Sequence, residues 1–365
     1  CGGSAIDVGG AFEEITSAEP AVNFATLIGH NTVRQSVMGR AQRAPTGDEL
    51  QKMKALVFKA MADGAVGFST GLQYIPGTYA KESEIVELAR VAANNNGVYV
   101  THMRNEGTAL LDAVAESINV GTLLKMPVQI SHLKVDSPKQ WGASVKALEM
   151  IDAARRRGID VEADQYAYTA GSSGLAIRFP PWALEGTGAE VTARLKDDAT
   201  WAKIKGEIVQ LLADRGFTDL SWATVATYRA RPEFNGLSMK AVAQKMLGAD
   251  TADAQLEAAR QMMINGGATM VYHFMSEDDV ETVMKHPMVG IASDAGVNVF
   301  GSGVPHPRGY GNSVRVLGHY VRDRKVIPLE EAVRKLSSLP ARQFGFEQRG
   351  EIREGWAADL VVFDP

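Results

Sequence analysis

The chain of 365 residues has 45% hydrophobic and 22% charged residues, as a globular protein does, and its length suits two average domains or one large α/β barrel. A net charge of −5, and no apolar run near the ~18 residues that cross a bilayer, give no reason to expect a nucleic-acid or membrane partner. The single cysteine excludes an internal disulfide framework, so nothing requires an oxidising compartment and we expect a cytoplasmic protein.

Short apolar, β-branched runs alternate with stretches of helical period along the chain. The predicted strands are Asn23–Ile28, Ala65–Ser69, Val98–His102, Val128–His132, Ile159–Asp164 and Val289–Asp294. The predicted helices between them are Gly47–Ala62, Glu82–Asn94, Ala109–Leu124 and Ser144–Arg157. Over residues 65–164 one strand follows another after about 30 residues, the length of a βα unit. This alternation predicts an α/β fold with a parallel sheet, closed or open.

The residues at the ends of these strands favour a closed barrel over an open sheet. His102, His132 and Asp294 each end a predicted strand, and Asp164 ends another. A (β/α)8 barrel gathers its active site from residues at the carboxyl ends of several strands. We therefore predict a TIM-like (β/α)8 barrel over residues 1–348.

The stretch from 170 to 287 is too long for one crossover, and we interpret it as an insertion over the barrel mouth. Its predicted elements are the helices Trp201–Arg215, Met239–Leu247 and Ala252–Asn265 and the strands Trp222–Thr227 and Thr269–His273. Residues 349–365 predict the start of the C-terminal part of a small β-domain. Because the chain begins at Cys1 without a methionine and ends inside a strand pattern, we expect a fragment that is missing sequence at both ends.

Two histidines predict a metal site. His102 and His132 each follow a β-branched run, one βα unit apart, so adjacent barrel strands would bring both imidazoles to the same rim. Imidazole suits zinc, and a catalytic zinc uses about three protein ligands and keeps one position open for water. A lone strand-end histidine is more often a hydrogen-bonded core residue, but a repeated one favours a metal. Asp294 fits either a ligand and proton acceptor or a helix N-cap.

These residues lie within a longer series of segments that resembles the amidohydrolase superfamily, and more closely the N-acyl-D-amino-acid deacylases. The matching segments are Cys1-Gly-Gly, Thr101-His-Met-Arg-Asn-Glu106, Ile130-Ser-His-Leu-Lys134, Asp164-Gln-Tyr-Ala-Tyr-Thr-Ala-Gly-Ser172, Phe179-Pro-Pro-Trp182, His273-Phe-Met-Ser-Glu-Asp-Asp279, Ile291-Ala-Ser-Asp294, His306-Pro-Arg308, Arg349-Gly-Glu-Ile-Arg-Glu-Gly355 and Ala358-Asp-Leu-Val-Val-Phe363. They run from the first residue to the last in the family's order. The resemblance implies a barrel of the metal-dependent hydrolase type, with a small β-sandwich.

The resemblance also implies the metal ligands. His102 and His132 match the histidines that hold one zinc tightly, and Cys1 matches a cysteine that replaces the carboxylated lysine of many relatives. Without the resemblance, a lone terminal cysteine is more often an inert small residue. Asp294 matches an aspartate that is a metal ligand and general base.

Five further positions match residues that contact substrate in the family. Lys134 and Tyr166 match groups that polarise the amide, and the resemblance implies that they support the oxyanion. Three positions are implied to bind substrate: Ser172, Met275 and Arg308. An arginine can pair with a carboxylate through two hydrogen bonds. The alternatives are a solvated lysine, a packed tyrosine, a core methionine and a surface arginine.

One departure from the family bears on the metal count. The family's first barrel strand ends in His-x-His, which holds a second, weaker metal, and no such pair occurs in this chain. The resemblance therefore implies a fragment that lacks the first barrel strand. The sequence therefore offers ligands for one tightly bound zinc and an incomplete second site.

We expect zinc-dependent hydrolysis of a linear amide, with a small N-acyl-D-amino acid as substrate and Asp294 as general base. A cyclic-amide hydrolase or isoaspartyl dipeptidase of the same superfamily is the enzymatic alternative. A catalytically inactive binding module is the other, because Gln165 and Ala167 alter a turn that often reads Asp-x-Tyr-Pro-Tyr.

Overall fold

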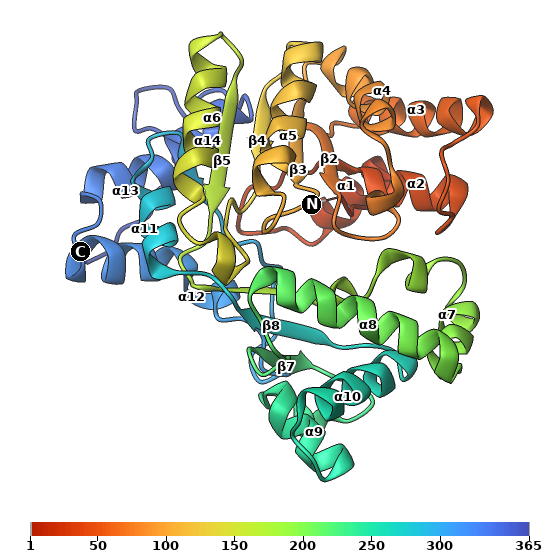
Figure 1. Ribbon diagram of the computed structural model, residues 1–365. Coiled ribbons are helices and arrows are strands. Elements are labelled where there is room, and N and C mark those ends of the chain that lie inside the picture. Colours follow the sequence, from red (N-terminus) through yellow and green to blue (C-terminus); the bar gives the residue numbers. More distant parts are fainter. Residues whose placement is uncertain (1, 365) are drawn as a thin grey trace.

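The computed structural model describes residues 2–364, and a parallel β-sheet with helices along it forms its larger unit (Figure 1). This sheet has six strands in the order β1-β2-β3-β4-β5-β9. Their bounds are β1 (Ile28–Gly29), β2 (Gly67–Gly71), β3 (Val98–His102), β4 (Val128–Ile130), β5 (Val161–Gln165) and β9 (Val289–Ile291). Every neighbouring pair runs parallel, which confirms the predicted α/β architecture.

The helices follow the strands as the sequence predicts. Their bounds are α1 (Val8–Ser17), α2 (His30–Met38), α3 (Gly47–Ala62), α4 (Glu82–Ala93), α5 (Leu110–Leu124), α6 (Ser144–Arg156), α7 (Gly188–Lys196), α8 (Asp198–Arg215), α9 (Met239–Leu247), α10 (Ala252–Ile264), α11 (Glu277–Lys285), α12 (Arg308–Arg315), α13 (Leu329–Leu336) and α14 (Ser338–Gln343). A capping box explains where α3 begins, because the side chains of Thr46 and Glu49 each accept from the other's backbone N–H. Consecutive helices α3, α4, α5 and α6 pack side by side.

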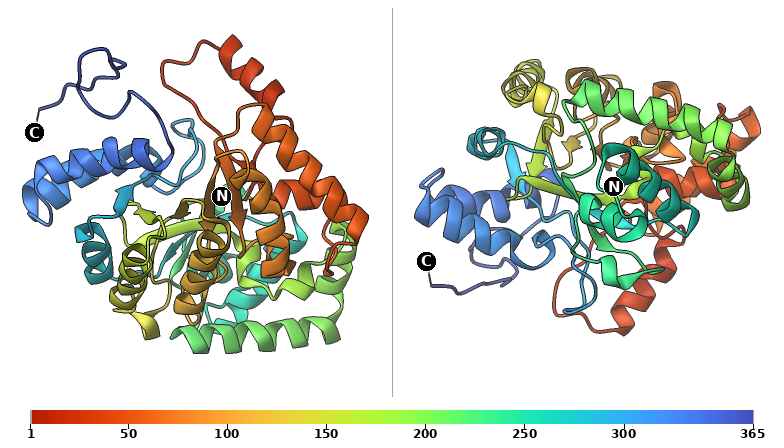
Figure 2. Two further views of the ribbon diagram at one scale, coloured as in Figure 1. Left: turned by 90° about the horizontal axis from the view of Figure 1, so that it is seen from above. Right: turned by 60° about the horizontal axis from the view of Figure 1, so that its bottom comes forward.

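The core of the parallel unit lies between the sheet and these helices. Phe68 and Tyr99 from neighbouring strands stack there and are almost fully buried, together with Leu88 of α4 and Val128 of β4. The strands are buried along their whole length, as parallel strands covered by helices are. Both views of Figure 2 show the red amino-terminal helices and the blue carboxy-terminal helices on opposite sides, as expected for segments next to the edge strands β1 and β9.

A second, antiparallel sheet lies beyond the carboxyl ends of the parallel strands (Figure 1). It has the order β6-β8-β7, with β6 (Ala170–Gly174), β7 (Ala223–Thr227) and β8 (Thr269–His273), and it carries α7 to α10. These elements pack around a second hydrophobic core, which includes Val225, Met270 and Ile204 and extends to Ile291 of β9. The insertion predicted over 170–287 covers these elements, and its assignment as an insertion of the barrel domain over the barrel mouth stays a prediction.

The structure corrects several predicted strand bounds. The strand predicted over Asn23–Ile28 is reduced to β1, Ile28–Gly29, and two other strands end earlier than predicted. β4 ends at Ile130 and β9 at Ile291, so His132 and Asp294 follow their strands instead of ending them. Both residues have left-handed backbones, with φ of 40° and 48°. Residues 350–364 contain neither helix nor strand, and the small β-domain expected from 349 stays a prediction. In the described part of the chain, no helix combines the length and apolarity needed to cross a membrane.

Gly67 of β2 tests how closely the parallel strands pack. A Cβ at this position would lie 2.1 Å from the backbone oxygen of Val98 on β3, so Gly67→Ala must displace one strand from the other. We expect the free energy of unfolding to fall by about 1–3 kcal/mol in urea denaturation. The matched control is Gly206→Ala on α8, where a Cβ meets nothing within 4 Å. This change favours the helix by about 0.5–1 kcal/mol, so an equal effect of both substitutions contradicts the prediction.

Candidate metal centre and substrate pocket

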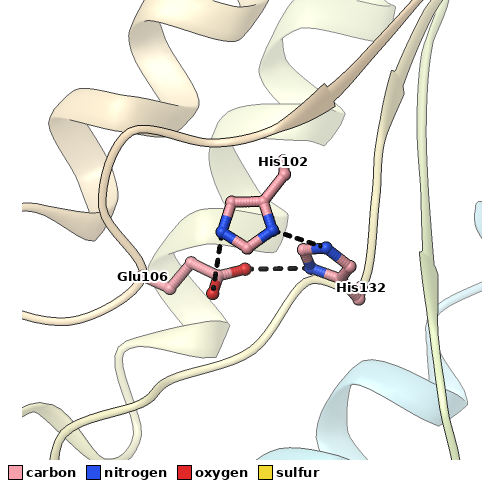
Figure 3. A group of neighbouring side chains, drawn as sticks. All are labelled: His102, Glu106 and His132. Carbon is pink, nitrogen blue, oxygen red and sulfur yellow. Dashed lines mark hydrogen bonds and ion pairs between the residues drawn. The ribbon is translucent and has the colours of Figure 1, made fainter. Parts of the chain in front are cut away.

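Three buried side chains converge where β3 and β4 end (Figure 3). His102 is the last residue of β3, Glu106 lies in the loop after it, and His132 lies just after β4. One potential ligand atom from each lies within 4.8 Å of the other two. Among the described residues this is the one group of three or more metal-ligating side chains.

The three side chains contact one another directly. His102 Nδ1 lies 2.9 Å from His132 Nε2, and His132 Nδ1 lies 3.0 Å from Glu106 Oε1. His102 Nε2 lies 3.8 Å from Glu106 Oε2, too far for a hydrogen bond. Lys134 Nζ donates to Glu106 Oε1 over 2.5 Å and lies 2.8 Å from His132 Nδ1. Lys134 therefore supplies a buried positive charge beside the carboxylate.

The electrostatics of the group favour the protonation states that bind a metal. Burial would raise the pKa of Glu106, but the charge of Lys134 and the hydrogen bond with His132 lower it below its ordinary value. Burial lowers the pKa of His102 well below its ordinary value. An ionised carboxylate and a neutral imidazole are the forms that ligate metals.

The donor set fits zinc. Two imidazoles and one carboxylate are ligands that zinc accepts, and the three groups are buried. His102 Nε2 is buried without a hydrogen-bond partner, which is rare for a polar atom unless something else binds it. The further ligand implied by the resemblance, Cys1, lies outside the described residues.

Asp164 holds His132 in its left-handed turn. Its Oδ1 accepts from the backbone N–H of His132 over 2.7 Å, and its Oδ2 accepts from Gln129 Nε2 over 2.7 Å. Burial raises the pKa of Asp164, and the two hydrogen bonds only partly offset this effect. This carboxylate therefore fixes the backbone that carries His132, and it is absent from the metal-ligating group.

A pocket opens beside the three residues, between the parallel and antiparallel sheets. Its lining combines predicted and unpredicted residues: Gln73, Tyr74, His102, Glu106, Lys134, Asp136, Tyr166, Gly171, Ser172, Ser173, Ile177, Arg178, Tyr272, Phe274, Asp294 and Arg308. Met275 is not in this lining, and its Sδ accepts from the Tyr166 hydroxyl over 3.7 Å. Ser172 directs its hydroxyl to the backbone oxygen of Met270, over 2.9 Å.

Asp294 and Arg308 form an ion pair at the pocket wall. Arg308 Nη2 lies 2.8 Å from Asp294 Oδ2, and the guanidinium lies over the Tyr166 ring at 4.4 Å from its centroid. His306 positions this arginine, because its Nδ1 accepts from the Arg308 backbone N–H over 3.0 Å while its Nε2 donates to Ala170 O over 2.8 Å. Burial lowers the pKa of His306 to about 4, so the ring stays neutral.

Sequence reasoning gave no role to three residues of this site. Glu106 lies four residues after His102, inside a segment that matches the family. This short spacing from a predicted ligand could have marked Glu106 as a second one. Tyr74 follows β2, and its ring lies 4.6 Å from that of His102. Arg178 precedes Phe179-Pro-Pro-Trp182, and nothing in the sequence marks it as buried.

The amidohydrolase family model matches residues 7–365. D-aminoacylase and N-acyl-D-glutamate deacylase of Alcaligenes xylosoxydans xylosoxydans are 35% and 34% identical over 353 residues, which cover 97% of this chain and 63% and 62% of those proteins. A D-aminoacylase crystal structure matches with a TM-score of 0.78 at 34% identity, covering 98% of this chain and 65% of that one.

The N-acyl-D-glutamate deacylase of Bordetella bronchiseptica, solved with zinc and a phosphonate mimic of the tetrahedral intermediate, matches with a TM-score of 0.79 at 32% identity, over 97% of this chain and 64% of that one. This chain thus spans less than two thirds of the length of these relatives. The structural matches confirm the predicted TIM-like α/β fold, and the family match confirms the resemblance seen in the sequence. The chain belongs to the amidohydrolase family.

Proposed function

We propose that this protein hydrolyses the amide bond of N-acyl-D-amino acids with zinc at the His102, Glu106 and His132 group. The observation that carries the proposal is that this buried group opens into a pocket which also holds Lys134 and Arg308. The names of its relatives, D-aminoacylase, N-acyl-D-glutamate deacylase and N-acyl-D-aspartate deacylase, support the same substrate class.

His102, Glu106 and His132 are the described residues that would hold the zinc. Cys1 remains a proposed further ligand, and one tightly bound ion is proposed at this group. When bound, zinc lowers the pKa of a coordinated water to near 7 and polarises a carbonyl.

Asp294 is the proposed general base. Its carboxylate lies in the pocket lining and is about one third exposed, so a water and a substrate both have access to it. It accepts a proton as the water oxygen bonds to the amide carbon, and it returns that proton to the nitrogen as the carbon–nitrogen bond breaks. The products are a carboxylic acid and a free amino acid.

Lys134 and Tyr166 are proposed to stabilise the oxyanion. Lys134 Nζ lies 5.7 Å from the Tyr166 ring centroid, so both side chains serve the same part of the pocket. Burial raises the pKa of Tyr166 well above its ordinary value, which keeps the hydroxyl protonated and able to donate. Donors already in place when negative charge develops lower the barrier most.

Arg308 is proposed to bind the α-carboxylate of the substrate, next to Ser172. In the structure it pairs with Asp294 and approaches the backbone oxygen of Ser172 at 3.4 Å. A substrate carboxylate competes with Asp294 for the same guanidinium. Binding therefore releases Asp294 from Arg308 at the moment when a base is needed.

Arg178 supports a preference for acidic amino-acid side chains. It lies in the pocket lining, 5% exposed, and among the described residues no carboxylate forms an ion pair with it. Its guanidinium lies 4.4 Å from the Tyr272 ring centroid, and its Nε has no hydrogen-bond partner. A buried cation without a counter-charge favours an anionic ligand.

Zinc loading tests the function. We expect the protein to release free D-amino acid from N-acetyl-D-glutamate, chelation to abolish the activity, and Zn²⁺ to restore it. His102→Ala removes a proposed ligand and is expected to lose both zinc, measured by metal analysis, and activity. An exposed histidine replacement, His273→Ala, provides the control. Activity only on hydantoins or isoaspartyl dipeptides, or a metal-free and inactive protein, contradicts the proposal.

Replacement of the proposed base gives a second prediction. Asp294→Asn keeps the shape of the side chain but cannot accept a proton, so we expect kcat to fall by about 100-fold or more. The same change at exposed Asp48 on α3 is the control and is expected to leave kcat unchanged. Steady-state kinetics at saturating zinc measure both, and a near-normal kcat for Asp294→Asn excludes it as the base.

Replacement of Arg178 tests the proposed preference for substrates with an acidic side chain. We expect Arg178→Met to lower kcat/KM for N-acetyl-D-glutamate by about 10- to 100-fold, the value of a charge-assisted contact. The same variant acting on N-acetyl-D-leucine is the internal control, because a neutral side chain gains nothing from the arginine. Equal losses on both substrates indicate that Arg178 only maintains the pocket wall.

A further inference from the structure

A loop after β4 forms hydrogen bonds and an ion pair with the C-terminal end of α8, which belongs to the antiparallel unit. Ser137 Oγ donates to the backbone oxygen of Arg215 over 2.9 Å, and Lys139 Nζ donates to that of Ala213 over 2.6 Å. The Arg215 guanidinium forms an ion pair with Asp136. Both side chains are more than nine-tenths buried, so this pair lies inside the junction of the two units.

Asp136 connects this junction to the candidate metal group. Its backbone N–H donates to the backbone oxygen of Glu106 over 2.9 Å, and its side chain lines the pocket beside Lys134. Its Oδ1 is buried without a hydrogen-bond partner. This oxygen lies so close to Gly107 that a Cβ there would approach it to 2.5 Å. The carboxylate therefore sits beside the loop that carries Glu106.

Two buried carboxylates and two buried cations thus share a small volume. Glu106 pairs with Lys134, and Asp136 pairs with Arg215. Because a buried charge without a partner is very unfavourable, each carboxylate needs its own cation. Loss of Arg215 leaves Asp136 unpaired, and Lys134, two residues away in the chain, lines the same pocket and can take the place of Arg215.

We propose that Arg215 is a positioning residue for the active site: by neutralising Asp136, it keeps Lys134 paired with Glu106 and directed at the reacting carbonyl. In this way a residue of the antiparallel unit neutralises a carboxylate of the parallel unit without contacting the substrate. The inference rests on the proposed function, since Lys134 is assigned there to the oxyanion.

Three variants of the zinc-loaded protein test this role with N-acetyl-D-glutamate. Arg215→Met is expected to lower kcat by about 10- to 100-fold, as loss of a partner that orients active-site groups does, with KM little changed. Arg215→Lys keeps the charge and is expected to retain most of kcat. Arg215→Met combined with Asp136→Asn removes both charges and is expected to recover kcat relative to Arg215→Met alone.

The double variant distinguishes this role from one in which Arg215 only holds α8 to the loop after β4. Asp136→Asn restores no contact with α8, so a recovery of kcat must come from the removed charge. A double variant no better than Arg215→Met overturns the inference, as does a normal kcat for Arg215→Met. Lys205→Met on α8, which removes a partly exposed ion pair with Asp253 of α10, is the matched control and is expected to leave kcat unchanged. If the unaltered protein releases no amino acid from N-acyl-D-amino acids, the proposed function fails instead.

Discussion

Charge neutralisation of buried carboxylates is the constraint on which the rest of this site depends. Glu106 is buried where β3 and β4 end, and it stays ionised because Lys134 and two imidazoles surround it. A carboxylate in a low-dielectric interior without such partners takes up a proton and loses its value as a ligand. The same requirement recurs at Asp136, which is buried and pairs with Arg215.

The two structural units contribute different kinds of residue to the site. The parallel sheet and the loops that follow it contribute His102, Glu106, His132 and Lys134, the groups proposed for chemistry. The antiparallel unit contributes Ser172 and Tyr272 to the lining, next to Arg178. Under the proposed function, a change in this second wall alters which amino acid fits without disturbing the metal group, in keeping with relatives named for different N-acyl-D-amino acids.

Sequence reasoning recovers what periodicity and local signals encode. The predicted bounds of β3, α3, α9 and β8 agree with the structure, because a clear period and a cap or glycine mark each of them. Hydrogen bonds to a distant residue are invisible in a local pattern, and for that reason the predicted strand continued through His132. β6 was missed because Ala-Gly-Ser-Ser-Gly carries no apolar alternation, and pairing with β8 makes it a strand. Arg178 is buried by rings from β8 and its neighbour Trp222, a placement that depends on the assembled sheet.

The left-handed backbone of His132 has a consequence for how the site meets a metal. A residue with a side chain adopts φ of 40° only where its surroundings hold it, and here Asp164 supplies the restraint. His102 is held by its strand, and its ring contacts Tyr74 and His132. Both imidazoles are therefore fixed before any ion arrives. The conformational entropy that flexible ligands lose when they gather around a metal has, at this site, already been lost when the chain folds.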